Sequence, residues 1–171
     1  MRLTWFAVLT SVVKPQCSNK RIVGGQSIDE NGSPFSADWI VSMSMGCGGS
    51  WISENYVLTA AHCFPNRKLD QSDVWELFGK DGDGRKKILG NITGGNVIVH
   101  EEFNPITMVN DIALVKICDE ISHTIIKIPD VFVEYESYFV YGWGTMKYGE
   151  ANIPDILQWV ETPYKRVGIN V

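Results

Sequence analysis

The sequence predicts an all-β fold. Between Trp39 and Met45 apolar side chains occupy alternate positions and are separated by Ser42 and Ser44, a period of two that is typical of a strand with one buried face. The chain contains no internal repeat and no low-complexity segment. Further short apolar runs with strand character occur at Ser50–Ile52, Tyr56–Leu58, Val74–Phe78, Val97–His100 and Ile112–Ile117.

Charge and length exclude some classes of function. A net charge of -5 offers no broad basic surface for nucleic acid. The apolar run from Leu3 to Val13 is too short to span a bilayer, which needs roughly 20 residues. Because Arg2 precedes it, it is typical of the hydrophobic region of a secretory signal peptide over residues 1–16, with a buried N-terminal strand as the alternative. We therefore expect a secreted, extracellular protein without a membrane anchor.

His62 is the first candidate for a chemical role. It stands among small residues, beside Cys63 and directly after the predicted strand at Tyr56–Leu58. A rigidly held histidine that solvent can reach suits a general base, because histidine ordinarily titrates near neutral pH. A lone histidine in such a position is more often a core residue beside a structural cysteine, but the surrounding motifs favour the base.

Four motifs resemble those of the trypsin/chymotrypsin-like serine peptidases, and they occur in the order of that family. Ile22-Val23-Gly24-Gly25 resembles the activated N-terminus, and Cys47–Ser53 resembles the strand that precedes the histidine box. Thr59–Cys63 resembles the histidine box itself, and Asn110–Val115 resembles the aspartate box. The resemblance covers about the first two thirds of a peptidase domain.

The resemblance implies a trypsin-like double β-barrel. The expected peptidase domain is 22–171 and is incomplete at its C-terminus; the first barrel, about 36–117, is complete. Tyr138–Gly144 and Leu157–Pro163 resemble the first strands of the second barrel, which is only partly present over about 131–171.

The same resemblance implies peptide-bond hydrolysis by a His-Asp-Ser mechanism acting on a protein or peptide substrate. His62 would be the general base and acid, and Asp111 would hold its tautomer and stabilise the imidazolium. An aspartate that enters an apolar strand is costly to bury unless it is paired, which supports this role over a turn-capping aspartate.

The nucleophile is missing from the sequence. Neither Gly-Asp-Ser-Gly-Gly nor Gly-x-Ser-x-Gly occurs in the 171 residues, and Ser50 in Gly-Gly-Ser-Trp lacks the nucleophile turn. We therefore interpret the chain as a truncated copy of a serine endopeptidase that is inactive as given. A non-catalytic homologue that acts as a binding or regulatory protein is the alternative.

The N-terminal sequence predicts that the protein is made as a zymogen with a short propeptide. Lys20 and Arg21 precede Ile22, so the resemblance implies a short propeptide, 17–21, that a trypsin-like activating protease removes by cutting between Arg21 and Ile22. A solvated basic turn is the alternative.

The four cysteines fit an exported protein. Cys47 and Cys63 carry the disulfide of the family, which contributes about 3 kcal/mol in the chain-entropy model. For Cys17 and Cys118 both a bridge and two free thiols are possible.

The remaining motifs point to the surface. Asn91-Ile92-Thr93 is a glycosylation sequon and predicts a surface loop, whereas the sequon at Asn31 is poorer because Pro34 follows it. Asp81 and Asp83 could suggest calcium, but loop position twelve holds an isoleucine where the EF-hand needs glutamate, so a solvated turn is preferred and no metal or other cofactor is predicted. Two further histidines, His100 and His123, are interpreted as structural.

Overall fold

The computed structural model describes residues 22, 24–28, 33–64, 69–131, 135–146 and 153–163. The predicted signal peptide, the propeptide with Cys17 and Arg21, and the sequon at Asn31 lie outside these residues. Within the described residues the regular elements are strands and two short 3-10 helices, so the all-β prediction is confirmed. They are β1 (Gln26–Ser27), β2 (Ile40–Met43), β3 (Gly48–Trp51), β4 (Tyr56–Thr59), η1 (Ala61–Cys63), β5 (Val74–Lys80), β6 (Lys86–Thr93), η2 (Gly94–Asn96), β7 (Val97–Val99), β8 (Ala113–Lys116), β9 (Ser137–Gly142) and β10 (Gln158–Pro163).

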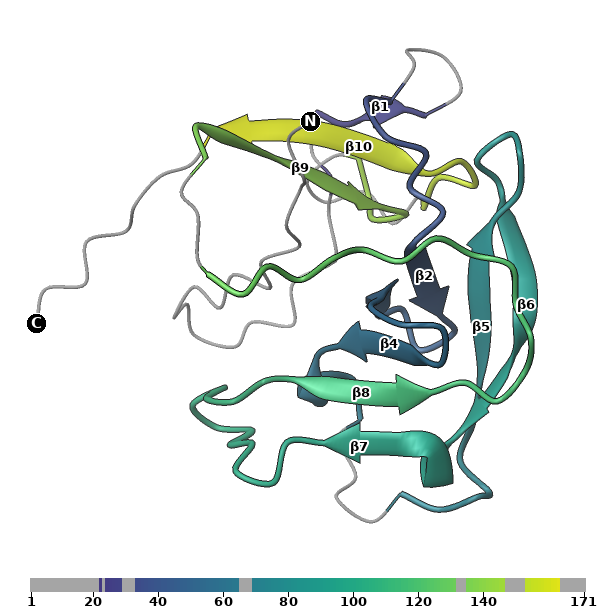
Figure 1. Ribbon diagram of the computed structural model, residues 1–171, viewed down its shortest axis with the longest axis vertical. Coiled ribbons are helices and arrows are strands. Elements are labelled where there is room, and N and C mark those ends of the chain that lie inside the picture. Colours follow the sequence, from purple (N-terminus) through teal and green to yellow (C-terminus); the bar gives the residue numbers. More distant parts are fainter. Residues whose placement is uncertain are drawn as a thin grey trace, which may run out of the picture.

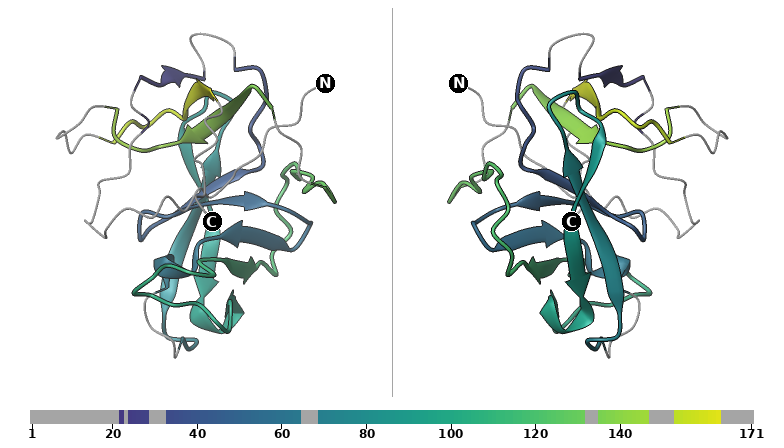
Figure 2. Two further views of the ribbon diagram at one scale, coloured as in Figure 1. Left: turned by 90° about the vertical axis from the view of Figure 1, so that its left-hand side faces the viewer. Right: turned by 90° about the vertical axis from the view of Figure 1, so that its right-hand side faces the viewer.

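The strands form two antiparallel sheets. The larger sheet has seven strands in the order β6-β5-β2-β3-β4-β8-β7, and it curls around its own core (Figures 1 and 2). The smaller sheet has three strands in the order β1-β10-β9 and lies at the other end of the molecule (Figure 1). This arrangement agrees with a partly present trypsin-like double barrel. No helix in the described part of the chain is long and apolar enough to cross a membrane.

The register between β4 and β8 brings the candidate site together. The two strands are antiparallel, with Tyr56 opposite Lys116 and Thr59 opposite Ala113. The residues that follow β4 and the residues that precede β8 therefore lie at the same edge of the sheet. His62 follows β4 and Asp111 precedes β8, so two residues that are 49 positions apart in the sequence are in direct contact.

β2 is buried on both faces, which corrects the expectation of a strand with one buried face. All four of its residues are buried, including Ser42 at 9% exposure. Val41 and Met43 belong to the core of the seven-stranded sheet, while Ile40 belongs to a second cluster with Tyr141. Because β2 lies between two cores, its second face is covered by the smaller sheet and not by water.

Two strands were not predicted from the sequence. In β6 only Ile92 is buried, so the strand shows no clear alternation, although it pairs with β5 along its length. β1 has two residues and exists because Gln26 and Ser27 pair with β10. Asn91 was expected in a surface loop and lies instead inside β6 opposite Glu76; its exposure agrees with the surface but its backbone is a strand.

The tip of the β5–β6 hairpin connects the two sheets. Asp81 forms the solvated turn, where its Oδ1 accepts the N–H groups of Asp83 and Arg85 at 3.0 and 2.9 Å. On its other side the tip pairs with the segment before β10: the N–H of Lys86 donates to the carbonyl of Asp155 at 3.1 Å. The hairpin thus ties the smaller sheet to the larger one.

Candidate active site

His62 is held by a short turn with buried ends. β4 stops at Thr59, and the chain then forms η1, in which Ala61 is fully buried and Cys63 is 8% exposed. The N–H of Phe64 donates to the carbonyl of Ala61 at 2.9 Å and closes the turn. The side chain of His62 is 48% exposed. The small neighbours Ala61 and Cys63 leave the imidazole accessible.

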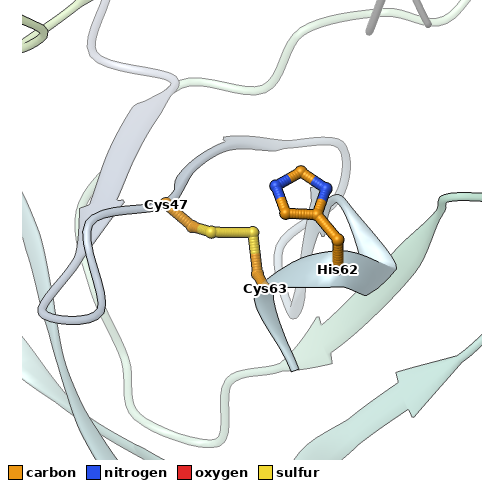
Figure 3. Close-up of side chains that lie close together, drawn as sticks. All are labelled: Cys47, His62 and Cys63. Carbon is orange, nitrogen blue, oxygen red and sulfur yellow. A yellow bond between two sulfur atoms is a disulfide. The ribbon is translucent and has the colours of Figure 1, made fainter. Parts of the chain in front are cut away.

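A disulfide between Cys47 and Cys63 fixes η1 to the chain just before β3, with the two Cα atoms 6.1 Å apart. This pairing is the one that the resemblance implies. Figure 3 shows the imidazole of His62 beside the two sulfur atoms. One ligand atom from each of the three residues lies within 4.8 Å of the others, but in the disulfide state the cysteines offer no thiolate to a metal ion.

Asp111 binds His62 twice. Its Oδ1 accepts the backbone N–H of His62 at 2.8 Å, and its Oδ2 lies 2.7 Å from Nδ1 of the imidazole. The Asp111 side chain is only 3% exposed. Because an ionised carboxylate can only accept, the contact assigns a hydrogen to Nδ1, and in the neutral imidazole Nε2 then carries the lone pair. The arrangement is therefore an oriented base whose accepting atom is not occupied by Asp111.

The backbone contribution was not visible in the sequence. A His and an Asp in the right order predict a side-chain pair, but nothing in the two motifs indicates that the amide of His62 also donates to the carboxylate. Asn110, directly before the aspartate, has a φ of 57°, a left-handed conformation that asparagine tolerates better than most residues. This turn points the Asp111 carboxylate back toward η1.

Comparison with known proteins decides the family. The sequence model of the Trypsin family matches residues 22–166. The chain belongs to the trypsin family.

Similar proteins include proteases from insects and mammals. Serine protease filzig of Drosophila melanogaster is 31% identical over 165 residues, covering 88% of this chain and 10% of that protein. Anionic trypsin of Canis lupus familiaris is 29% identical over 164 residues, covering 90% of this chain and 62% of that protein. Trypsin-3 of Homo sapiens is 30% identical over 167 residues, covering 91% and 51%. The chain thus spans roughly half to three fifths of the mammalian trypsins that it matches.

Ile22, where the match to the trypsin family begins, is buried. It is 6% exposed, and its N–H donates to the carbonyl of Thr145 at 2.9 Å. A Cβ on Gly142 would lie 3.1 Å from Cδ1 of Ile22, so the isoleucine packs directly on the end of β9. Ile22 and Cys47 both line a cavity of about 240 Å³. Arg21, the other half of the predicted activation bond, lies outside the described residues.

The other histidines and Ser50 are held by local contacts. His100 accepts the N–H of Glu102 at Nδ1, 3.1 Å away, in an exposed turn. His123 stacks on Trp51 with ring centroids 3.9 Å apart, and its two ring nitrogens face backbone carbonyls. Ser50 is 5% exposed in the middle of β3. None of these contacts places the three side chains against the His62–Asp111 pair, in keeping with their structural interpretation.

Cys118 is exposed and forms no disulfide with another described cysteine. Its alternative partner Cys17 lies outside the described residues, so the bridge between the two cysteines and the two free thiols both stay open.

Proposed function

We propose that the chain carries the base and the orienting acid of a trypsin-like serine endopeptidase. The observation that supports this proposal is the double contact of Asp111, which joins one carboxylate to both the amide and Nδ1 of His62. In such a pair Nε2 removes the proton of a serine hydroxyl as that oxygen attacks the scissile carbonyl. The buried carboxylate stabilises the imidazolium, which then protonates the leaving amine.

The serine is the missing component. Since no nucleophile motif occurs in the 171 residues, the chain by itself is not expected to hydrolyse a protein or peptide substrate. Acyl transfer requires a serine from sequence outside these residues. The alternative proposal is a non-catalytic homologue that binds partners, and the missing motif is the observation that favours it.

Secretion, activation and glycosylation belong to the same proposal. Residues 1–16 serve as the signal peptide and 17–21 as the propeptide, which a trypsin-like protease removes at Arg21–Ile22. The burial of Ile22 against β9 supports a docked N-terminal segment. Asn91 is exposed on β6 and carries a glycan in this proposal. Treatment with a glycosidase should lower the mass of the secreted protein, and Asn91→Gln should remove this mass difference. The peptidase domain is 22–171, with a first barrel at about 36–117 and part of a second at about 131–171.

Transcript sequencing followed by active-site labelling tests the catalytic proposal. The 3′ end of the transcript is read first, and the secreted, activated product is then treated with a fluorophosphonate. We expect a reading frame that continues into Gly-Asp-Ser-Gly-Gly and a labelled serine. Asp111→Asn is then expected to lower kcat by roughly 10⁴, because the wrong histidine tautomer is favoured. His100→Ala is the matched control and keeps full activity.

Two results would contradict catalysis. A stop codon directly after Val171 together with no labelling would leave the binding homologue as the function of the chain. Unchanged kcat in Asp111→Asn would show that a labelled serine acts without this pair.

Activation is tested separately by N-terminal sequencing. Arg21→Gln should give no chain that begins at Ile22 after treatment with trypsin, because it removes the side chain that a trypsin-like activator recognises at that bond; a cut after Lys20 remains open and leaves a chain that begins at residue 21. Lys20→Gln is the matched control and should still yield a chain that begins at Ile22. An Arg21→Gln product whose N-terminal residue is Ile22 would contradict the assignment of this bond.

A further inference from the structure

The Cys47–Cys63 disulfide and the imidazole of His62 together place three side chains of metal-binding type side by side. Cys47 and Cys63 are 6% and 8% exposed, and their sulfur atoms lie with the imidazole in one group of potential ligand atoms, all within 4.8 Å of one another (Figure 3). Two thiolates and one imidazole form a ligand set that suits zinc, with a fourth position left for water. The sulfur–sulfur bond prevents metal binding, because the bonded cysteines offer no thiolate.

The orientation of the imidazole suits coordination as well. Nδ1 faces Asp111 at 2.7 Å, so the lone pair available to a metal is that of Nε2. A metal-bound histidine usually donates its other ring N–H to a carboxylate, which orients the ring and raises its basicity. Asp111 already occupies that second position.

We propose that reduction of the Cys47–Cys63 disulfide converts this corner into a zinc-binding site with Cys47, Cys63 and His62 as ligands. A dithiol reductant supplies two electrons and two protons: the sulfur–sulfur bond of the protein breaks, two thiols form, and the reductant becomes a disulfide. Zinc then displaces the two thiol protons, and Nε2 donates its lone pair.

The geometry requires only small movements. Tetrahedral zinc with Zn–S of about 2.3 Å and Zn–N of about 2.0 Å needs ligand atoms roughly 3.5–3.8 Å apart. The three atoms lie within 4.8 Å of one another, so rotation of side chains after the bond opens can close the site. The imidazole of His62 is 48% exposed, so an ion can reach the site from the solvent side.

Metal binding would prevent His62 from acting as a base, because the ion would occupy the lone pair of Nε2. This consequence rests on the proposed function, because Nε2 is the atom that would take the serine proton. The binding itself is independent of catalysis and is tested without any activity measurement.

Cobalt is the probe of choice because thiolate ligation gives it charge-transfer absorption and tetrahedral ligation gives it strong visible bands. The 171-residue chain with Cys17→Ser and Cys118→Ser is reduced with a dithiol, desalted without oxygen and titrated with Co²⁺. We expect one equivalent to bind with both spectral features, zinc to displace it, and the unreduced chain to give neither. His100→Ala should bind as the parent does.

Asp111→Asn distinguishes a built site from loose chelation. His62 and Cys63 are adjacent, so they could chelate together even in an unfolded chain, whereas Asp111 reaches them only in the fold. Loss of the supporting carboxylate should weaken Co²⁺ binding about 10–100-fold in native buffer and have no effect in concentrated urea. For the parent, Co²⁺ should raise the Tm of the reduced chain, since the ion binds the native state.

Three results would overturn the proposal. They are equal Co²⁺ binding before and after reduction, no sulfur-to-cobalt absorption after reduction, and a Tm that falls with added Co²⁺. The last result would mean that the ion binds the unfolded chain, and it does not depend on how any variant folds.

Discussion

The carboxylate of Asp111 stays buried at 3% exposure because His62 satisfies both of its oxygens. A buried charge without such partners is expensive, so the pair must form together or not at all. The backbone N–H also orients the carboxylate, because it donates to Oδ1 while Oδ2 faces Nδ1. At the scale of single residues, the candidate site therefore depends on one carboxylate held by two donors of one residue.

The buried phenol of Tyr141 predicts that the free energy of unfolding depends on pH. It is 2% exposed, and its hydroxyl lies 2.8 Å from Oγ of Ser33. Burial raises the pKa of the Tyr141 phenol above its ordinary value of about 10, and the hydrogen bond from Ser33 offsets this only in part. The unfolded chain thus loses this proton first, so the free energy of unfolding falls as pH rises past about 10.

We expect Tyr141→Phe to remove that alkaline loss. Urea unfolding between about pH 8 and about pH 11 should show a flatter decline for the variant, at a cost of about 1 kcal/mol near neutral pH for the lost hydrogen bond. Burial lowers the pKa of Lys86, which gives the opposite slope, but this contribution is common to both proteins and cancels in the comparison. Tyr138→Phe is the control that should decline like the parent. An equally steep decline in Tyr141→Phe would refute the assignment.

At the scale of elements, β2 carries two packing roles. Val41 packs into the larger core, while Ile40, 3% exposed, packs with Trp39 and Tyr141 in the smaller one. An alternating pattern in the sequence indicates which residues share a face, but it does not indicate that a second sheet covers the other face. β6 is the reverse case: backbone pairing with β5 makes it a strand although it buries little.

The double burial of β2 predicts a large effect of Ile40→Ala. Deleting a buried isoleucine side chain typically costs about 2–5 kcal/mol. If the second face were solvated, as the sequence pattern indicates, the cost would stay within roughly 0.5 kcal/mol. Ile98→Ala on β7 is the control, since Ile98 is 55% exposed. Chemical denaturation of both variants measures the difference, and similar small values would place Ile40 in contact with water.

At the scale of the whole molecule, the two sheets rest on unequal cores. Among the described residues the larger cluster contains fifteen buried residues and the smaller cluster contains six. The smaller sheet is joined to the rest by the hairpin tip, by Ile22 and by the outer face of β2. Less buried area means a lower free energy of local opening for β9 and β10.

Hydrogen exchange measures this difference directly. We expect the amides of β9 and β10 to exchange faster than those of β4 and β8 in native buffer, because the smaller sheet can open while the larger core stays closed. The pairing of β4 with β8 also carries the His62–Asp111 contact, so the candidate site should remain protected during such opening. A single common rate for all four strands would contradict this order and show one cooperative unit.

Much of this fold follows from the chain alone. The strands with apolar periodicity, the disulfide partners and the candidate pair His62 and Asp111 were expected from pattern and resemblance, because motif and periodicity are properties of neighbouring residues. β1 and β6 were not expected, because pairing with distant strands makes them regular. The contacts of the site likewise come only from the tertiary structure: the register of β4 on β8 gives Asp111 the amide of His62, and the fold places two sulfurs beside the imidazole. Such contacts join residues far apart in sequence, and no local pattern encodes the distance between them.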